Sequence, residues 1–321
     1  MRAIVLEETG SPPRLARIAP PVPGPDDVLI DVAACGLNFA DLLMINGQYQ
    51  ERRPLPLTLG MEIAGTVRAC GRNVKGLHPG MRVAAFTGHG GLAEQVICPG
   101  VRCLPLTDAI PMTEAAGFPV AYGTSHLALS HRARLQQGET LVVLGAAGGV
   151  GLTAVEIGAA LGARVIAVAR GEAKLEIAHA AGAAHCLDST GMDLRTVLKS
   201  LGGADIIFDA IGEPLATPAL RALRPEGRYL AIGFAGGNVP TFPANILLVK
   251  NLTVIGLYWG GYLDFAPDTL MESLHDLMRM YDTGGLRPHV SHVLPLTRFA
   301  EGLDLLRSRK STGKVVITLV P

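Results

Sequence analysis

The stretch Leu141-Val-Val-Leu-Gly-Ala-Ala-Gly-Gly-Val-Gly151 decides the fold of this 321-residue chain. A short apolar run predicts a buried strand, the glycines predict a tight turn, and the apolar segment 152–161 predicts a helix. Strand, glycine turn and helix in this order form a site where free N–H groups at a helix start bind a dinucleotide pyrophosphate. Gly148 lets the backbone approach that anion, and Gly151 lets the helix pack on the strand. Ala146 replaces the first glycine of the fingerprint, so a turn that only joins strand to helix is the alternative.

From about residue 122 the chain repeats this order of strand, glycine turn and helix, which predicts a doubly wound parallel sheet over residues 122–258. The runs after the glycine turn are apolar almost without interruption, which is typical of strands buried on both faces. The expected strands are 164–169, 183–187, 205–211, 228–233 and 252–257, with a helix over 172–181.

The two ends of the chain have a different sequence pattern, without the repeated strand, glycine turn and helix. Residues 1–121 together with 259–321 are expected to form one β-rich domain. Short β-rich runs alternate with turn residues near the N-terminus, at 2–6, 28–33, 63–69, 81–85 and 94–98. Helices over 268–281 and 298–308 and a strand over 314–320 follow near the C-terminus. A length of 321 residues suits about two domains of roughly 150 residues.

Composition excludes several function classes. The 28 basic and 28 acidic residues cancel, which gives no electrostatic footprint for nucleic acid or an anionic membrane surface. Five scattered cysteines do not form a disulfide scaffold, so a reducing cytoplasm is the expected compartment. Neither a signal peptide nor a spanning helix is expected.

Charge at the end of the second sheet strand points to the cofactor. An NAD site usually carries a carboxylate there, for the ribose hydroxyls. This chain has Arg170, followed by Lys174 in the next helix. Two cations in reach of a 2′-phosphate favour NADPH, although Lys174 also suits a solvated helix face.

Five motifs together resemble the medium-chain dehydrogenase/reductase superfamily, and within it the zinc-free NADPH:quinone oxidoreductases related to zeta-crystallin. They are Cys35-Gly-Leu-Asn-Phe-Ala-Asp41, Gly60-Met-Glu-Ile-Ala-Gly65, the Gly145–Gly151 turn, Ile232-Gly-Phe-Ala-Gly236 and Gly313-Lys-Val-Val316. The resemblance implies a GroES-like β domain built from both chain ends, a Rossmann domain between them and a cleft at their junction. It also implies a homodimer joined through Rossmann edge strands, with 252–257 as the seam.

The resemblance also implies the site residues. Either Asn38 or Tyr49 is expected to donate a hydrogen bond to the substrate oxygen, and Tyr49 can also stack on a flat ring; Tyr49 as a packing aromatic is the alternative. Asp41 is expected to hold the backbone or Asn38 in place rather than to move protons. NADPH contacts are expected from Val120, Ala147, Gly148, Gly149, Val150, Arg170, Lys174, Ser189, Ile211, Phe234, Ala235 and Lys314. Ser189 stands where well-known relatives have a tyrosine, and Val120 where many have a threonine.

No metal is expected. Asn38 and Met61 occupy the positions of the cysteine and histidine that hold catalytic zinc in alcohol dehydrogenases of the superfamily, and neither replaces such a ligand. Cys35 is expected to be a packing residue, and His289 with His292 to be surface histidines rather than a metal pair.

Hydride transfer without zinc favours acceptors that delocalise negative charge, so we expect an NADPH-dependent reductase of quinones or α,β-unsaturated carbonyls. Two alternatives remain open. One is reduction of an acrylyl-CoA or haloacrylate double bond, for which Arg52 and Arg53 are candidate phosphate ligands. The other is a non-catalytic NADPH-binding protein that serves as a crystallin or sensor.

Overall fold

The computed structural model describes residues 1–319 and divides the chain into two compact units. Unit 1 consists of Met1–Val120 with Pro288–Pro321, and unit 2 of Ala121–Arg287. Unit 1 is therefore built from both ends of the chain. The second boundary lies at residues 287–288 rather than at the predicted 258–259.

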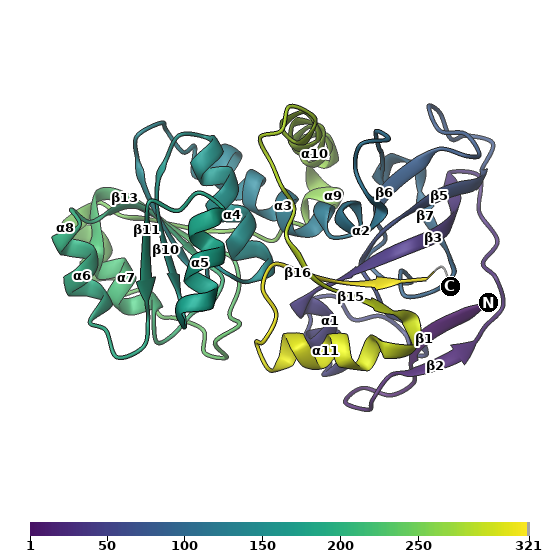
Figure 1. Cartoon of the computed structure of the whole chain (residues 1–321), viewed down its shortest axis with the longest axis horizontal. Helices are drawn as coiled ribbons and strands as arrows, with labels where there is room; N and C mark the ends of the chain where they lie inside the picture. The colour runs from purple at the N-terminus through teal and green to yellow at the C-terminus, as the bar shows by residue number, and fades with distance from the viewer. Residues whose placement is uncertain (320–321) are drawn as a thin grey trace. The chain divides into compact units, whose positions relative to one another are not determined.

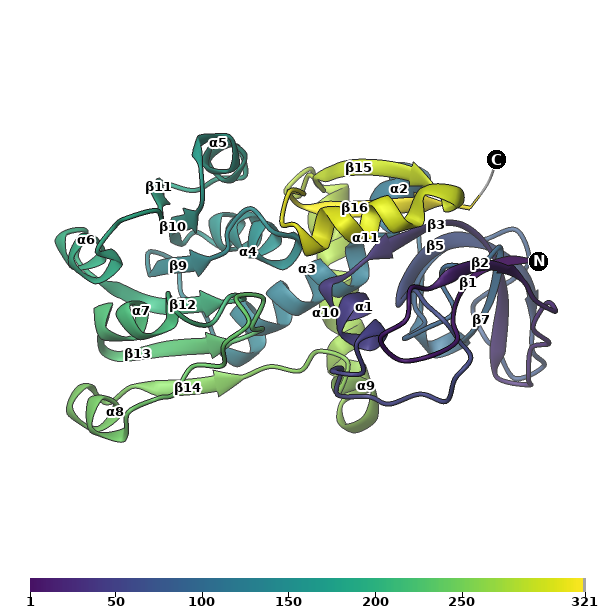
Figure 2. The ribbon, with the colours of Figure 1, turned by 90° about the horizontal axis from the view of Figure 1, so that it is seen from below.

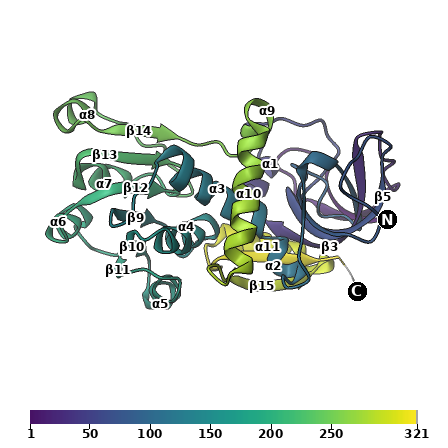
Figure 3. The same cartoon turned by 90° about the horizontal axis from the view of Figure 1, so that it is seen from above.

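This later boundary follows from the packing of two helices, α9 (Tyr262–Phe265) and α10 (Pro267–Asp282), which belong to unit 2. Figure 3 shows α9 at one end of the long α10. A buried hydrogen bond of 2.8 Å joins Ser273 of α10 to His126, the last residue of α3 (Phe118–His126). The apolar face of α10 is buried as well. The sequence of α10 predicts this apolar face but does not indicate which of the two units it packs against.

Unit 2 contains a six-stranded sheet in the order β11-β10-β9-β12-β13-β14, and all of its strand pairs are parallel (Figure 2). Numbered along the chain, this order is 3-2-1-4-5-6, the order of a dinucleotide-binding Rossmann sheet. The strands are β9 (Thr140–Leu144), β10 (Arg164–Ala169), β11 (His185–Asp188), β12 (Ala204–Asp209), β13 (Leu223–Ala231) and β14 (Thr253–Gly256).

Helices cover both faces of this sheet (Figure 1). One face carries α4 (Gly149–Ala160) and α5 (Glu172–Ala180), and the other carries α6 (Leu194–Ser200), α7 (Ala216–Ala222) and α8 (Ala244–Lys250). The α3 helix continues into a π-helical stretch, η2 (Leu127–Arg132). The doubly wound fold class predicted from the sequence is thus confirmed.

Unit 1 contains a seven-stranded sheet, in which β15-β16-β3-β5-β6-β8 follow one another and β7 pairs with β3, and a three-stranded sheet β2-β1-β4. The seven strands are β3 (Asp27–Leu37), β5 (Glu62–Cys70), β6 (Arg82–Phe86), β7 (Gln95–Pro99), β8 (Cys103–Pro105), β15 (Val290–Pro295) and β16 (Lys314–Thr318). The other three are β1 (Arg2–Leu6), β2 (Arg14–Arg17) and β4 (Leu57–Thr58). Antiparallel pairing of β16 with β3, with Val316 opposite Gly36, joins the two ends of the chain.

The helices of unit 1 are short. They are α1 (Phe39–Ile45), α2 (Met112–Ala115), α11 (Phe299–Arg307) and the 3₁₀ turns η1 (Gly100–Arg102) and η3 (Leu296–Arg298). The predicted final strand ends at Thr318 rather than at Val320, and Val320 lies outside the described residues. None of the helices within residues 1–319 combines the length and apolar character needed to cross a membrane.

Candidate functional site

The glycine turn of unit 2 has the geometry that a pyrophosphate site requires. Gly145 follows β9 with a φ of +77°, which only glycine adopts without strain. Gly148 is the N-cap of α4, and as a glycine it has no side chain with which to cap the N–H groups of the first helical turn. A Cβ atom on Gly151 would lie 2.1 Å from the Gly145 carbonyl oxygen, which explains the glycine there. Ala147 lies in the same turn, and Gly149 and Val150 are the first two residues of α4.

The predicted phosphate-binding cations follow the next strand. Arg170 comes directly after β10 and is exposed, and Lys174 lies in the first turn of α5 and is half-buried. Ser189 follows β11, and its N–H donates to the Ala169 carbonyl at 2.9 Å. Because carboxyl ends of parallel strands meet at one edge, these residues and the glycine turn share that edge of the sheet.

Asp188, at the end of β11, is a residue of this edge that the sequence reading missed. Its carboxylate accepts hydrogen bonds from Gly171 N–H at 3.2 Å and Thr190 N–H at 2.9 Å. The hydrogen bonds from Thr190 hold the pKa of Asp188 below its ordinary value. Asp188 thus fixes the loop that carries Arg170 and the loop that carries Ser189.

A buried carboxylate shapes the same edge at β12. Asp209 accepts from the N–H groups of Ile211 and Gly212 at 2.8 and 2.9 Å, and from the Tyr229 hydroxyl at 2.5 Å. Burial raises the pKa of Asp209 and, together with the nearby Asp209 charge, that of Tyr229. The Ile211 side chain lies against Gly145.

Phe234 and Ala235 follow β13 in the adjacent loop. Phe234 is 41% exposed, and Ala235 N–H donates to the Ala210 carbonyl at 3.2 Å. The cofactor residues predicted between 147 and 235 therefore all lie at the carboxyl edge of one sheet.

In unit 1 the predicted residues Asn38 and Lys314 belong to a buried charged cluster. The Lys314 ammonium donates to the Leu37 carbonyl at 2.8 Å, to Asn38 Oδ1 at 2.7 Å and to Glu62 Oε1 at 2.8 Å. The Lys314 and Glu62 side chains are only 7% and 0% exposed. All three ammonium N–H groups are thus used within unit 1, so a contact of Lys314 with a cofactor would need one of them to exchange.

Glu62 organises this cluster and was not among the predicted site residues. Its Oε1 also accepts from Asn38 Nδ2 at 2.9 Å, and its Oε2 accepts from Val120 N–H at 2.8 Å. One carboxylate therefore holds Asn38, Lys314 and Val120, the last residue of unit 1 before the chain enters unit 2. The sequence could have indicated Glu62, because an acidic residue inside the otherwise apolar run 61–65 is unusual.

Asp41 holds the backbone around Asn38. Its Oδ2 accepts from Asn38 N–H at 2.8 Å, and its Oδ1 accepts from Gly60 N–H at 3.3 Å. Asn38 is the N-cap of α1, and Asp41 at the third helical position completes a capping box. Burial raises the pKa of Asp41 to about 6, although both hydrogen bonds and the Lys314 charge oppose that shift.

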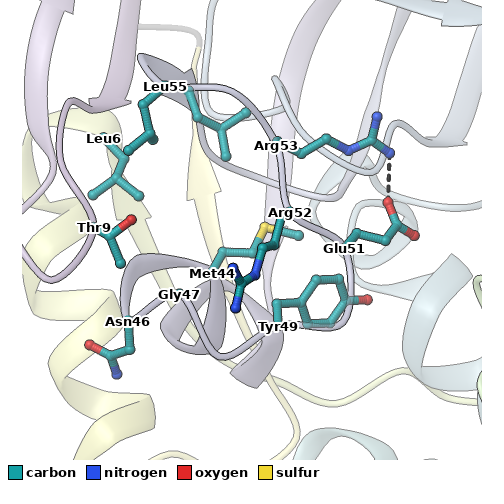
Figure 4. Close-up of a pocket in the computed structure, with 11 residues that line it drawn as sticks. Leu6, Thr9, Met44, Asn46, Gly47, Tyr49, Glu51, Arg52, Arg53 and Leu55 are labelled. Carbon is teal, nitrogen blue, oxygen red and sulfur yellow. Dashed lines mark hydrogen bonds and ion pairs between the residues drawn. The ribbon is translucent and has the colours of Figure 1, made fainter.

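Tyr49 lies apart from this cluster, in a pocket of about 300 Å³ beside the carboxyl end of α1 (Figure 4). The pocket has a buried apolar floor that includes Leu6, Met44 and Leu57. Tyr49 itself is half-buried. The structure therefore places the two predicted substrate-binding side chains of unit 1 in separate surroundings.

The residues weighed as metal ligands have other surroundings. Cys35 is buried, and burial raises its thiol pKa well above the ordinary value. His292 lies on β15 opposite Val315, and the His289 ring lies 3.0 Å from the Thr312 hydroxyl. Within residues 1–319 no group of three or more His, Cys, Asp or Glu side chains could hold a metal ion.

Comparison with known proteins relates both units to one family. The family model of the alcohol dehydrogenase GroES-like domain matches residues 24–108, and that of the zinc-binding dehydrogenase domain matches residues 149–276. Quinone oxidoreductase-like protein 2 of Mus musculus is 38% identical, over 99% of this chain and 92% of its own. The chain belongs to the quinone oxidoreductase family of the medium-chain dehydrogenases/reductases.

Solved structures of this family superpose on the chain closely. Quinone oxidoreductase from Thermus thermophilus, also solved with NADPH, gives a TM-score of 0.88 at 34% identity over 99% of this chain and 100% of that one. Escherichia coli quinone oxidoreductase, solved with NADPH, gives 0.91 at 25% identity over the same shares. Both the family and the GroES-like plus Rossmann architecture inferred from the five motifs are confirmed.

Proposed function

We propose that this quinone oxidoreductase family member is an NADPH-dependent reductase of quinones or α,β-unsaturated carbonyls that works without zinc. The observation that carries the proposal is the carboxyl edge of the unit 2 sheet. There an uncapped α4 N-terminus follows a glycine turn, and two cations follow the neighbouring strand. This combination fits a pyrophosphate and a 2′-phosphate, and two solved relatives are complexes with NADPH.

NADPH, when bound, supplies the hydride. The chain's own residues hold it: the first-turn N–H groups of α4 bind the pyrophosphate, while Arg170 and Lys174, with the Ser189 hydroxyl, bind the 2′-phosphate. Ile211, Phe234 and Ala235 border the same edge and exclude water from it.

Asn38 donates a hydrogen bond to the carbonyl oxygen of the acceptor, and Tyr49, in its separate surroundings, stacks on the ring of the acceptor. Both amide hydrogens of Asn38 are already used, by Glu62 at 2.9 Å and by the Gly36 carbonyl at 3.3 Å. The longer bond, to Gly36, is the one that exchanges for the acceptor. Asp41, Glu62 and Lys314 are positioning residues that keep this amide in one orientation.

Zinc independence rests on the chemistry of the donors at the positions implied for zinc ligands. Asn38 is an amide engaged by Lys314 and Glu62, and Met61 offers a thioether. The positive charge next to the Glu62 carboxylate is an ammonium of the chain itself. Such a site suits acceptors whose own conjugation spreads the charge that arrives with the hydride.

The test of this function is a steady-state assay with NADPH and NADH against a panel of quinones and enones, with product identification. The Arg170→Ala/Lys174→Ala variant is expected to raise the KM for NADPH by at least about tenfold and to leave the KM for NADH nearly unchanged. Equal losses with both cofactors would contradict the assigned phosphate site. Binding of NADPH without turnover of any acceptor would favour a non-catalytic protein.

We further propose a homodimer through the β14 edge. β14 is the outermost strand of the sheet, and Leu248 and Val249 of the preceding α8 are 77% and 76% exposed. An open edge beside exposed apolar side chains favours pairing with a second copy. Light scattering is expected to give twice the chain mass, and Leu248→Asp/Val249→Asp to give a monomer; a monomeric wild type would exclude this seam.

A further inference from the structure

The pocket beside α1 combines an apolar floor with charged walls. Leu6, Met44 and Leu57 form the floor and are at most 8% exposed. Tyr49 contributes an aromatic ring to the wall (Figure 4). Such a surface suits a flat, apolar ring system lying against the tyrosine.

Three charged side chains line the same pocket, and their charges do not cancel. Arg53 pairs with Glu51, with a distance of 2.6 Å between Arg53 Nη2 and Glu51 Oε2. Figure 4 shows this pair at the edge of the pocket, with the Arg52 side chain directed elsewhere. Arg52 forms no ion pair with any residue in the described part of the chain. The pocket therefore carries one uncompensated positive charge.

A guanidinium binds a carboxylate or another planar oxyanion through two parallel hydrogen bonds, which are among the stronger ones in proteins. The pocket volume of about 300 Å³ lies at the small end of ligand sites. It accommodates a compact molecule of one or two rings with an anionic substituent. A whole CoA would not fit inside it.

We propose that this pocket selects the acceptor: the protein prefers compact conjugated carbonyl compounds that carry a carboxylate or similar oxyanion, which Arg52 binds. The inference rests on the proposed reductase function. In the reaction, hydride from NADPH and one proton from solvent convert the enone to the saturated ketone and NADPH to NADP⁺. The oxyanion takes no part in bond making and serves only for recognition.

The experiment compares two matched acceptors, benzylideneacetone and its para-carboxy derivative, with the full-length protein and NADPH. The para position lies away from the reacting double bond, so the two differ mainly in charge. Wild type is expected to show a kcat/KM at least about tenfold higher for the carboxylated compound, with most of the difference in KM.

Variants then test whether Arg52 is the residue that causes this preference. Arg52→Gln is expected to lower the ratio of the two kcat/KM values at least about tenfold, and Arg52→Lys to lower it less. Glu51→Gln, which removes the negative charge of the pocket, is expected to raise the ratio. Arg72→Gln is the matched control, because Arg72 is exposed and does not line the pocket. It changes net charge equally and is expected to leave the ratio within about threefold.

Two results would overturn the proposal: a wild type that does not favour the carboxylated acceptor, or an Arg52→Gln variant that loses activity equally with both. If neither acceptor is reduced, the panel of quinones and enones decides the reductase function, and calorimetric titration of the carboxylated compound decides the pocket separately. Binding to wild type that is lost in Arg52→Gln would keep the anion site, and equal binding to both proteins would reject it.

Discussion

Lys314 and Glu62 place two opposite charges in the interior of unit 1, where each depends on the other. The Glu62 carboxylate accepts hydrogen bonds from Asn38, Val120 and Lys314, and its side chain is 0% exposed. Such a pair is not by itself evidence of high stability, because desolvation offsets much of the attraction. Removing one partner, however, leaves a buried charge without compensation.

We therefore expect Lys314→Met to lower the free energy of unfolding by about 3–5 kcal/mol, measured by urea denaturation. The double variant Lys314→Met/Glu62→Gln is expected to recover most of that loss, since no charge remains buried. A single variant as stable as wild type would show that solvent reaches Glu62.

Asp41 predicts a pH dependence of stability. Its folded-state pKa of about 6 lies above the ordinary 3.8, so the folded protein binds more protons between these values. Its contribution to stability is therefore fully present below pH 4 and is lost as pH rises through 6, by about 3 kcal/mol in total.

Comparison with Asp41→Asn isolates this contribution, because asparagine does not titrate. The difference in unfolding free energy, wild type minus variant, is expected to fall between pH 4.5 and pH 7.5 and to stay level above that range. A difference that rises with pH would have the opposite sign and would contradict the raised pKa.

At the scale of elements, the turn from β9 into α4 separates a structural glycine from a binding glycine. A Cβ atom on Gly151 meets the Gly145 carbonyl oxygen at 2.1 Å, whereas one on Gly148 meets only that oxygen, at 3.4 Å. The φ of Gly148, −77°, is also suitable for alanine. The two positions therefore differ in what a methyl group disturbs.

Gly148→Ala is expected to leave the free energy of unfolding within about 1 kcal/mol of wild type and to weaken NADPH binding at least about tenfold, because the methyl group occupies the approach to the helix N-terminus. Gly151→Ala is expected to lower stability by more than about 2 kcal/mol. Fluorescence titration and thermal unfolding of both variants test this contrast. Unchanged NADPH affinity in Gly148→Ala would remove the pyrophosphate from this turn.

The sequence predicted some helices and strands correctly and missed others, for physical reasons. The strand over 164–169 has the predicted bounds because a fully buried parallel strand is a continuous apolar run. β15 was missed because His292 and its half-exposed neighbours give no apolar alternation. Short helices such as α1 depend on caps and tertiary contacts more than on periodicity.

The candidate site was predictable where its residues are close in sequence. The glycine turn and Arg170 follow strands that the sequence shows plainly. Glu62 and Lys314 are 252 residues apart, and nothing in either segment names its partner. The Arg52 pocket combines β1, α1, β4 and the loops after β1 and α1, so only tertiary structure reveals it.

At the scale of the whole molecule, the chain passes from one unit to the other twice, at residues 120–121 and 287–288. Within unit 2, Glu156 of α4 accepts hydrogen bonds from residues close to both of these passages. Its carboxylate accepts from the Tyr122 hydroxyl and from Arg287 N–H, each at 2.5 Å. Tyr122 is the second residue after the first passage, and Arg287 directly precedes the second. Burial raises the pKa of Glu156, against these hydrogen bonds.

Glu156→Ala is expected to lower the free energy of unfolding of unit 2 by about 1–3 kcal/mol, because the buried Tyr122 hydroxyl loses its acceptor. In a Tyr122→Phe background the same change is expected to have a smaller effect. Hydrogen exchange is expected to lose protection in α3 and α10 while unit 1 is unaffected. Equal effects in both backgrounds would contradict the coupling.

The joining of β16 to β3 has a consequence for biosynthesis. The continuous segment 121–287 can close its sheet as soon as it leaves the ribosome, whereas the earlier-made β3 keeps an open edge and an uncompensated Glu62 until Lys314 emerges. β16, which is synthesised after the other strands of unit 1, thereby completes the sheet that the first-synthesised residues begin. Translation products that stop short of it present an unfinished sheet, which cellular quality control can distinguish from the finished protein.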